Sequence, residues 1–507
     1  MMERIMIQNL RSLGNTGQIE LKPINILVGG NSSGKSTFLR FFPLMKQSLG
    51  KRINGPILWS GDEDDYVDFG SFKEALNFNS EDEKIKFAFE IIVPLDSHRF
   101  GVRKRTTENN VTVYVKYYLK AKDANYDYVS QMDFEVFGRK IVIKLDENMR
   151  ILSASVDKRI YEMVNKDTSD ETFQNSERGT FDISLYNIIK YARKKIPEQL
   201  LIDLDEMEER ESFIDINDVI EYYFRKEILK NTDSFPLKYK DIIEKNCKEE
   251  FVEKELFEDM LVLFKLSRVY QENITRYLNI YFRQVYYIAP VRATAERYYR
   301  LRNSAINEVD CRGKNLAVFL NSLSAPQFKK FQEWTNENLG FSIEKSPSEG
   351  FVSLKIKKKG ASKAINLSHT GFGCSQILPI VTQLWYIAMR GKIHYREFEN
   401  IPITFAVEQP ELHLHPALQA TLVDVIVNVM QESKNNIRFI IETHSETIVN
   451  RLGNLIYKEK LQKDQVGISI FNKEMGDDDT TIQVGNYDEE GYLENWPAGF
   501  FEPEEVQ

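Results

Sequence analysis

Short apolar runs alternate with helical periodicities at both ends of the chain. Near the N-terminus, INILVGG predicts a strand, and KSTFLRFFPLMKQSL, after a turn rich in glycine and serine, predicts a helix. Toward the C-terminus, ITFAVE and IRFIIET predict strands on either side of the helical pattern PALQATLVDVIVNVMQ. Strands that alternate with helices are typical of an α/β core with a largely parallel sheet.

Between these two ends the pattern changes twice. KIKFAFEIIV and VTVYVKYYLKA alternate apolar and polar positions, which predicts the antiparallel strands of a β subdomain. The next part has helical periodicity and crowded charges without sustained heptads, which favours an inserted helical region over a long coiled coil. Later, FVSLKIKKKG predicts an edge strand. We therefore expect an N-terminal lobe over 1–150, a helical insertion over 151–280 and a C-terminal lobe over 281–507.

Composition and charge narrow the classes of protein. The chain has 507 residues, of which 42% are hydrophobic, so it can bury a large core and form more than one folded unit. A net charge of −9 excludes a uniformly basic nucleic-acid-binding surface. Cys247, Cys311 and Cys374 lie far apart, and we find neither a signal peptide nor a membrane span. We expect reduced thiols, a cytoplasmic location and no membrane partner.

The segment GGNSSGKST fits the phosphate-binding pattern G-x-x-x-x-G-K-[ST] between a predicted strand and a predicted helix. Its glycines let backbone N–H groups surround a phosphate, its lysine reaches the β- and γ-oxygens, and its first serine supplies a ligand to Mg²⁺. The pattern therefore predicts binding of ATP with Mg²⁺. The predicted binding residues are Gly29, Asn31, Ser32, Ser33, Gly34, Lys35, Ser36 and Thr37.

Two later strands end in residues that suit the other half of such a site. Glu408 closes ITFAVE and is the candidate for a magnesium ligand beside Ser36. Gln409 stands where a nucleotide hydrolase would keep a second carboxylate to act on water. His444 follows IRFIIET, at the same edge of the expected sheet, and is a candidate catalytic residue.

These motifs together resemble the head of ABC-type ATPases, the class shared by SMC, repair and OLD (overcoming lysogenisation defect) proteins. In VEQPELHLHP the resemblance implies a D-loop at Leu412–Pro416, and in ETHSE it implies a switch histidine at His444. It also implies a signature segment that completes a neighbouring subunit's site. LSHTGFGCSQ, Leu367–Gln376, lies where this segment should be but departs from Leu-Ser-Gly-Gly-Gln. Gly371 and Gly373 allow close backbone approach, and Gly373 and Ser375 are its candidate nucleotide-contacting residues. An ordinary glycine turn with a helix cap is the alternative.

A narrower resemblance rests on YIAPVRATAERYY, GFGCSQILPIV and YLENWPAGFFEP. Together they are similar to a subgroup of OLD-like AAA ATPases, and the match covers about residues 1–95 and 281–507. The resemblance implies a homodimeric ATPase of an antiphage defence system such as Septu or PARIS, which controls a separate nuclease or toxin in response to a phage trigger. We expect no room for an appended Toprim nuclease. Arg292 and Arg297 have no assigned role, surface ion pairing being the simple alternative.

Several alternatives stay open. A DNA repair or maintenance ATPase of the RecF or SMC kind would need a DNA-binding groove, and the basic runs at Arg103 and Lys355 support nucleic-acid contact only weakly. The acidic stretch 476–479 fits a solvated hairpin turn better than a nuclease site. In the candidate active site, Gln409 positions water without accepting its proton, which predicts slow hydrolysis. Alternatively, Glu411 acts as the base or Gln409 only caps its loop.

Overall fold

The computed structural model describes residues 1–94, 110–163, 269–301, 306–390, 401–473 and 479–497, apart from positions 52, 54, 64, 124 and 125. It also describes residue 500 and isolated positions between 181 and 267. The described chain divides into two compact units, the first comprising Met1–Phe87, Asp123–Tyr126 and Asn279–Gln507, the second Ala88–Lys122 and Asp127–Leu278. Most of the helical insertion expected over 151–280 lies outside the described residues.

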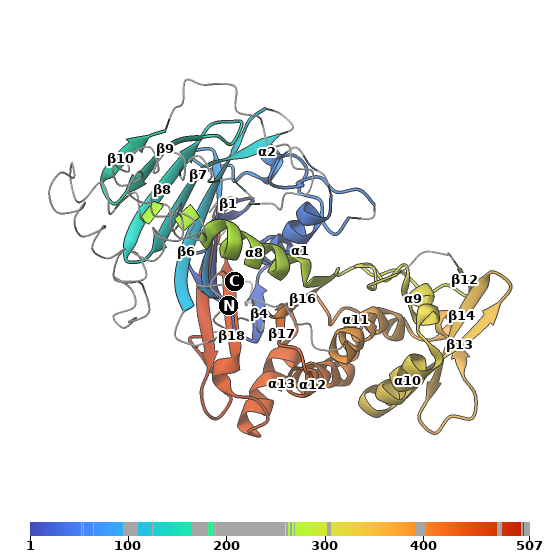
Figure 1. The fold of residues 1–507 in the computed structure, drawn as a ribbon. Helices are drawn as coiled ribbons and strands as arrows, with labels where there is room; N and C mark the ends of the chain where they lie inside the picture. Colours follow the sequence, from blue (N-terminus) through green and yellow to red (C-terminus); the bar gives the residue numbers. More distant parts are fainter. Residues whose placement is uncertain are drawn as a thin grey trace, which may run out of the picture. The chain divides into compact units, whose positions relative to one another are not determined.

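The first unit is built on a seven-stranded sheet with the order β11-β16-β17-β4-β18-β19-β20 (Figure 1). The first five of these strands run parallel, and every residue of β4, β16 and β17 is buried. Such continuous burial is expected for parallel strands with helices on both faces. The strands are β4 (Ile24–Gly29), β11 (Val285–Ile288), β16 (Ile403–Glu408), β17 (Ile437–Glu442), β18 (Val466–Asn472), β19 (Thr481–Tyr487) and β20 (Leu493–Glu494).

Helices cover this sheet on two sides. Helix α1 (Lys35–Gly50) packs on β4, β11, β16 and β17, and Figure 1 shows α11, α12 and α13 together on the other side of these strands. The latter three are α11 (Phe372–Met389), α12 (Pro416–Glu432) and α13 (Glu446–Tyr457). The α/β core with a largely parallel sheet, predicted from the alternation of apolar patterns, is thereby confirmed.

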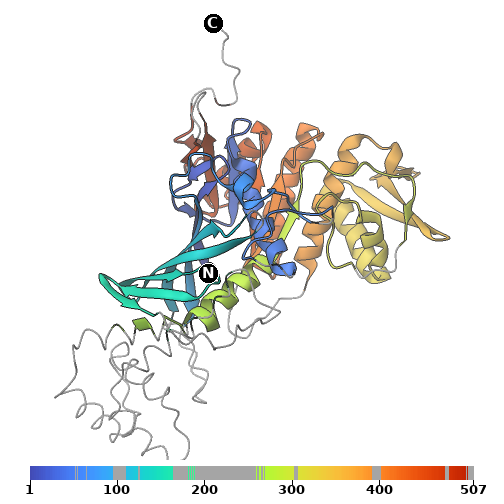
Figure 2. The same ribbon diagram turned by 90° about the horizontal axis from the view of Figure 1, so that it is seen from above.

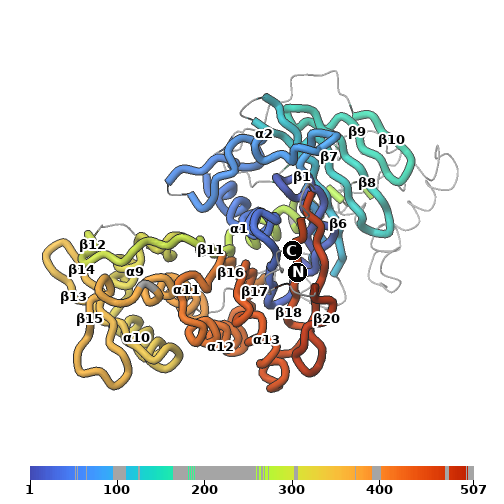
Figure 3. The backbone as a smooth tube through the Cα atoms, turned by 180° about the vertical axis from the view of Figure 1, so that it is seen from behind, coloured from blue at the N-terminus to red at the C-terminus, as the bar shows by residue number. Residues whose placement is uncertain are grey.

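A smaller sheet in the same unit has the order β12-β14-β13, with β15 also paired to β14 (Figure 3). The prediction that FVSLKIKKKG forms an edge strand is wrong, because β14 has partners on both sides. Its lysines alternate with the buried Val352, Leu354 and Ile356, so the basic run marks the polar face of a paired strand. The elements are β12 (Tyr299–Arg300), α9 (Leu316–Ser322), α10 (Ala325–Leu339), β13 (Phe341–Ser348), β14 (Phe351–Lys358) and β15 (Ile365–Asn366).

Antiparallel strands make up most of the described second unit (Figure 2). The strands β6 to β10 pair in chain order, which confirms the antiparallel β subdomain. They are β6 (Asn110–Ala121), β7 (Asp127–Val136), β8 (Arg139–Leu145), β9 (Ile151–Val156) and β10 (Arg159–Glu162). The chain passes from the first unit to the second within β5 (Lys84–Pro94).

The N-terminal strands and several short helices complete the described fold. Strand β1 (Met2–Leu10) pairs antiparallel with β2 (Leu13–Asn15) and with β3 (Ile19–Glu20). Among the helices that the structure describes, none is both long and apolar enough to cross a membrane. The remaining helices are α2 (Phe72–Ala75), η1 (Tyr270–Ile274), α8 (Thr275–Arg283), η2 (Leu367–His369) and η3 (Lys463–Gln465).

A close backbone contact fixes α13 against the turn before β20. A Cβ atom added at Gly453 would lie 2.2 Å from the carbonyl oxygen of Gly491. We therefore expect Gly453→Ala to lower the free energy of unfolding by about 1–3 kcal/mol, since overpacking outweighs the roughly 1 kcal/mol that alanine adds to a helix. Urea unfolding measures this change. Asn454→Ala, at the next and exposed position, serves as the control, and a Gly453→Ala protein as stable as this control would contradict the prediction.

Candidate active site

The phosphate-binding loop connects β4, which ends at Gly29, to α1, which begins at Lys35. A Cβ atom at Gly29 would lie 2.2 Å from the carbonyl oxygen of Phe471, and Gly34 has a φ of 91°. Both positions therefore require glycine, one for space and one for backbone conformation. The N-cap of helix α1, Gly34, makes no side-chain hydrogen bond to the first amide groups of the helix, and such groups suit an anion. The strand–loop–helix context predicted for this motif is confirmed.

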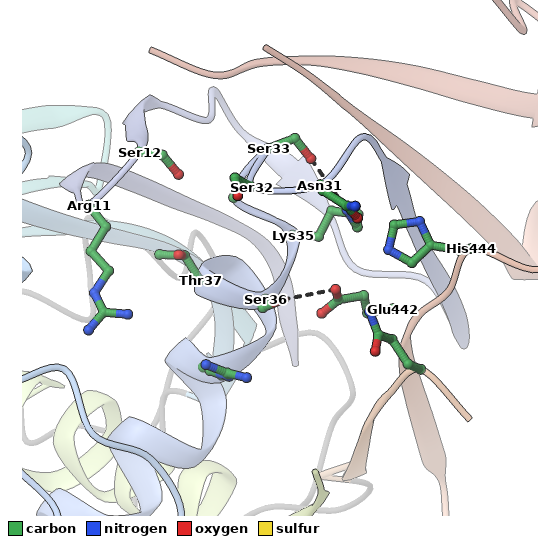
Figure 4. Close-up of a pocket in the computed structure, with 13 residues that line it drawn as sticks. Arg11, Ser12, Asn31, Ser32, Ser33, Lys35, Ser36, Thr37, Glu442 and His444 are labelled. Carbon is green, nitrogen blue, oxygen red and sulfur yellow. Dashed lines mark hydrogen bonds between the residues drawn. The ribbon is translucent and has the colours of Figure 1, made fainter. Parts of the chain in front are cut away.

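The loop lines a cavity of about 340 Å³, a volume typical of small-molecule sites (Figure 4). Nine residues named from the sequence line it, and Arg11, Ser12, Arg40 and Glu442 join them without having been predicted. The predicted Gly29, Glu408, Glu411, Gly373 and Ser375 do not line it. The full lining is Arg11, Ser12, Asn31, Ser32, Ser33, Gly34, Lys35, Ser36, Thr37, Arg40, Gln409, Glu442 and His444.

Lys35 is held by the backbone of its own loop. Its Nζ donates hydrogen bonds to the carbonyl oxygens of Gly29 at 3.0 Å and Gly30 at 2.6 Å, and its side chain is buried. Burial lowers the pKa of Lys35, and the charges of Glu442 and Glu411 oppose that shift. These two carbonyl bonds are ones that phosphate oxygens can replace, and charge-assisted bonds to phosphate are stronger.

Two buried carboxylates lie side by side at the ends of neighbouring strands. Glu408 of β16 and Glu442 of β17 are register partners, with exposed fractions of 1% and 2%. Facing them, α1 presents Ser36 and Arg40, which share a helix face because they are four residues apart. Ser36 Oγ donates to Glu442 Oε1 at 2.8 Å, and Arg40 donates to both oxygens of Glu408, at 2.7 and 2.8 Å. The hydroxyl of Ser36 thus contacts Glu442, whereas the carboxylate predicted to lie beside Ser36 was that of Glu408.

Arg40 and Tyr287 balance the negative charge of the Glu408 carboxylate. Besides Arg40, the hydroxyl of Tyr287 donates to its carboxylate at 2.7 Å, and Arg292 Nη2 donates to its carbonyl oxygen at 3.0 Å. Burial acts to lower the pKa of Arg40, but the hydrogen bonds and charge of Glu408 outweigh it and raise that pKa. The role of Glu408 as a magnesium ligand stays a prediction, because its carboxylate is bonded to Arg40 and Tyr287 here.

The simple alternative for Arg292, a surface ion pair, is wrong. This side chain is buried, with an exposed fraction of 3%, and its Nη2 donates to the carbonyl oxygen of Glu408 at the end of β16. Burial lowers the pKa of Arg292 to about 10. Arg297, in contrast, is exposed, and its guanidinium lies 5.7 Å from the centre of the Tyr298 ring.

Glu442 is the carboxylate whose bonding is incomplete. Its Oε2 is buried and has no hydrogen-bond partner in the part of the chain that the structure describes. Burial, and then the charge of Glu408, raise the pKa of Glu442 to about 7. A buried carboxylate oxygen without a partner is costly unless a donor or a cation joins it.

The residues fit a magnesium ion held together with nucleotide. Within the described ranges no three or more His, Cys, Asp or Glu side chains group so that they could hold a metal alone. Mg²⁺ is usually held by one or two protein oxygens together with phosphate oxygens and water. The hydroxyl of Ser36 and the oxygens of Glu442 are such ligands beside the phosphate-binding loop.

Gln409 lines the cavity in a conformation that is unusual for its type. Its φ of 42° lies in the left-handed region, and its backbone N–H donates to the carbonyl oxygen of Glu442 at 2.8 Å. His444 lines the same cavity (Figure 4). Burial and the charge of Lys35 lower the pKa of His444, so its ring is neutral at pH 7 and can accept a hydrogen bond.

Glu411 does not line the cavity, and both of its carboxylate oxygens accept hydrogen bonds. Its Oε2 accepts from Thr443 Oγ1 at 2.8 Å, and its Oε1 accepts from the backbone N–H of His444 at 2.7 Å. Burial raises the pKa of Glu411, and these two bonds oppose that shift. The carboxylate therefore joins the residue before the predicted D-loop to the two residues that follow β17.

The predicted signature segment packs against the D-loop of its own chain. Helix α11 begins after Gly371, and a Cβ atom at Gly373 would lie 2.9 Å from the carbonyl oxygen of His413. Ser375 is buried in the first turns of the helix, with an exposed fraction of 6%. The exposed residues at this end are His369 and Gly371. The predicted roles of Gly373 and Ser375 in a neighbouring subunit's site stay predictions.

Two of the unpredicted cavity residues had signals in the sequence. Arg40 follows Ser36 by four residues in a predicted helix, so the two side chains are expected on the same helix face. Glu442 ends IRFIIE as Glu408 ends ITFAVE, and two parallel strands place such ends at one edge of the sheet. We find no comparable signal for Arg11 or Ser12, which lie between β1 and β2.

Comparisons with known proteins identify a matching family and similar solved structures. Residues 1–449 match the family described as AAA ATPase domain, and no curated protein matches the chain. Among solved structures, the chain is similar to the Smc head domain of Pyrococcus furiosus bound to the C-terminal domain of ScpA, with 12% identity, coverage of 95% of this chain and 96% of that one, and a TM-score of 0.34. It is also similar to the SMC head domain from Thermotoga maritima, with 9% identity, coverage of 95% and 98%, and a TM-score of 0.35.

These structural likenesses are distant, and the assignment does not depend on them. The family match includes the phosphate-binding loop, both strand-end carboxylates, Gln409 and His444. It agrees with the sheet of parallel strands and with the lined cavity next to α1. The chain belongs to the AAA ATPase domain family and is an ATPase with a P-loop α/β fold.

Proposed function

We propose that this ATPase is a slow, nucleotide-gated switch, whose long-lived ATP-bound state is its output. The observation that carries the proposal is the amide of Gln409 in the cavity, directly after the strand that ends in Glu408. An amide cannot take a proton at neutral pH, and a general base contributes about 10²- to 10⁴-fold to rate. The site therefore has the parts that bind ATP but not an efficient base at this position.

Gln409 is suited to positioning water. Phosphoryl transfer passes through a loose transition state in which positioning matters most, and GTPases use a glutamine to orient the attacking water. The backbone hydrogen bond from Gln409 to Glu442 ties the loop to β17. His444, neutral and on the same cavity, supplies a second hydrogen-bonding group near the γ-phosphate position.

Glu411 is poorly placed to act as the base instead. Both of its oxygens accept hydrogen bonds, from Thr443 and from the backbone of His444. Hydrogen bonds to a charged group contribute about 1.5–3 kcal/mol each, and a swing toward the cavity would break both. We therefore assign Glu411 to holding the loop, and water positioning to Gln409.

We further propose that two copies form a dimer that encloses ATP between the P-loop of one and the signature segment of the other. One chain then cannot complete a site, and a two-fold dimer completes two. Support comes from the exposed Gly371 at the start of the 18-residue helix α11, whose first amide groups suit a phosphate. Because Ser375 is buried, we assign this contact to the helix start and not to the Ser375 hydroxyl.

The cellular role that we propose is a sensor or scaffold of an antiphage defence system. The resemblance of GFGCSQILPIV, VEQPELHLHP and the C-terminal tail to ATPases of systems such as Septu and PARIS supports it. In this role a phage component triggers the switch, and a separate nuclease or toxin acts as effector. A RecF- or SMC-like maintenance ATPase would instead hydrolyse ATP faster with DNA, so turnover with and without DNA discriminates the two roles.

The first prediction here concerns the catalytic base. Gln409→Glu places a carboxylate next to the attacking water, and we expect ATP turnover to rise at least about tenfold. Glu411→Gln removes one acceptor oxygen from a structural clamp, and we expect turnover to change less than about threefold while stability falls by about 1–3 kcal/mol. Steady-state phosphate release measures the turnover of each variant, and urea unfolding measures its stability. An inactive Glu411→Gln protein beside an unaccelerated Gln409→Glu protein would assign the base to Glu411.

The second prediction concerns assembly. Lys35→Ala should abolish ATP binding, whereas Gly371→Asp should retain it and lose ATP-dependent dimerisation, because a carboxylate repels the partner's phosphate. The space around Gly371 is open, and Asp is a favoured N-cap, so Gly371→Asp should not lower thermal stability. A mixture of the two variants should regain part of the ATPase activity, since each mixed dimer keeps one intact site.

Verified mixed dimers without any recovered activity would refute the two-chain site. Ser375→Ala provides the matched comparison within the same helix. We expect this variant to dimerise with ATP, because Ser375 is buried; loss of ATP-dependent dimerisation in Ser375→Ala alone would return the contact to Ser375.

A further inference from the structure

The order of the strands places Glu442 closer to the phosphate-binding loop than Glu408. Strand β17 lies between β4, which leads into the loop, and β16. Adjacent strands are about 4.8 Å apart, so the end of β16 is one strand spacing further from the loop than the end of β17. Glu442 is moreover the register partner of Leu27 in β4.

The two carboxylates also differ in their partners on α1. Glu408 is paired with a cation, since Arg40 donates to both of its oxygens and Tyr287 adds a third bond. Glu442 is paired with the hydroxyl of Ser36, the residue of the phosphate-binding loop that supplies a magnesium ligand in P-loop ATPases. Only the second pair joins a carboxylate directly to that hydroxyl.

The free oxygen of Glu442 is an independent observation. Glu442 has an exposed fraction of 2% and lines the cavity. Its Oε2 has no hydrogen-bond partner within the described residues. Burial without a partner would be unfavourable if this arrangement were only structural. A cation brought by the nucleotide would satisfy the oxygen.

We propose that Glu442 is the carboxylate that meets the Mg²⁺ of bound ATP, and that the Arg40–Glu408 ion pair lies behind it as a support. The inference rests on ATP binding at this cavity. It adds a metal-facing residue from the strand next to the P-loop strand and gives Glu408 a positioning role. In this arrangement Ser36 and Glu442 hold the ion, and Arg40 keeps a second negative charge from competing for it.

The test measures nucleotide affinity with and without the metal. The full chain is titrated with a non-hydrolysable ATP analogue by calorimetry, once with Mg²⁺ and once with excess chelator. In Glu442→Gln we expect the tightening by Mg²⁺ to fall at least about tenfold, while the affinity in chelator changes less than about twofold. Titration of Mn²⁺ in the presence of the same analogue, followed by electron paramagnetic resonance, should show the matching loss of bound metal.

Two further variants make the result specific. In Glu408→Gln we expect the Mg²⁺ dependence to persist and the melting temperature to fall, because Arg40 and Tyr287 lose a charged partner. Glu446→Gln, the same change at an exposed residue four positions after Glu442, should leave both quantities unchanged.

Thermal unfolding without nucleotide separates a metal-facing residue from a structural one. We expect Glu442→Gln to melt no lower than the wild type, because the amide keeps an oxygen that can accept from Ser36 and removes one of two carboxylates that are buried side by side. A markedly lower melting temperature, with Mg²⁺ dependence retained, would make Glu442 a structural residue and overturn the proposal.

Two other outcomes would also overturn it. If Glu408→Gln loses the Mg²⁺ dependence and Glu442→Gln keeps it, Glu408 leaves Arg40 and holds the metal. If Glu442→Gln loses turnover while its Mg²⁺ dependence is normal, Glu442 acts on water and not on the ion. A wild-type chain that binds no nucleotide even in Mg²⁺ would instead challenge the cavity as an ATP site, a failure that the wild-type titration alone reveals.

Discussion

Two carboxylates buried side by side constrain the rest of this structure. Glu408 and Glu442 are register partners on adjacent parallel strands, and two like charges in a low-dielectric interior disfavour each other's ionised form. The fold accommodates them through a single helix. One turn of α1 separates Ser36, which bonds Glu442, from Arg40, which pairs with Glu408. The position of α1 on the sheet is thus tied to the strand ends by a hydrogen bond and an ion pair.

The same arrangement links nucleotide binding to stability. Arg40 compensates one of the two charges, whereas Glu442 keeps an unpartnered oxygen and a raised pKa. Lys35, nearby, is buried, and its partners among the described residues are neutral atoms of its own loop. Mg²⁺ with ATP brings a cation for the carboxylate and an anion for the lysine. A ligand that binds only the folded state stabilises it, and here its cation would lie beside a buried carboxylate oxygen without a partner among the described residues.

Sequence reasoning succeeded where the signal is local. The P-loop, the strands around it and their helices follow from residue spacing and from apolar periodicity over a few turns. It failed for FVSLKIKKKG, because β14 pairs not only with β13 but also with β12 and β15. The last two strands have two residues each and carry no pattern of their own. It also missed the Ser36–Glu442 pair, since that contact depends on which strand lies next to β4. Likewise, the burial of Ser375 depends on how α11 packs on α12, β11 and β16, which residue spacing within the segment does not reveal.

The loop after β16 and the loop after β17 behave as one structural piece. Gln409 bonds to the backbone of Glu442, and Glu411 bonds to Thr443 and to the backbone of His444. A shift of either loop would therefore move Gln409 and His444 together. The D-loop in turn lies against Gly373 at the start of α11, so the three segments are in contact in series. In a dimer of the kind proposed, a partner that presses on the start of α11 would act on this series of contacts and so on the geometry around the γ-phosphate. In the proposed dimer, that connection would give assembly, in place of the chemistry of a strong base, a physical route to control the rate of hydrolysis.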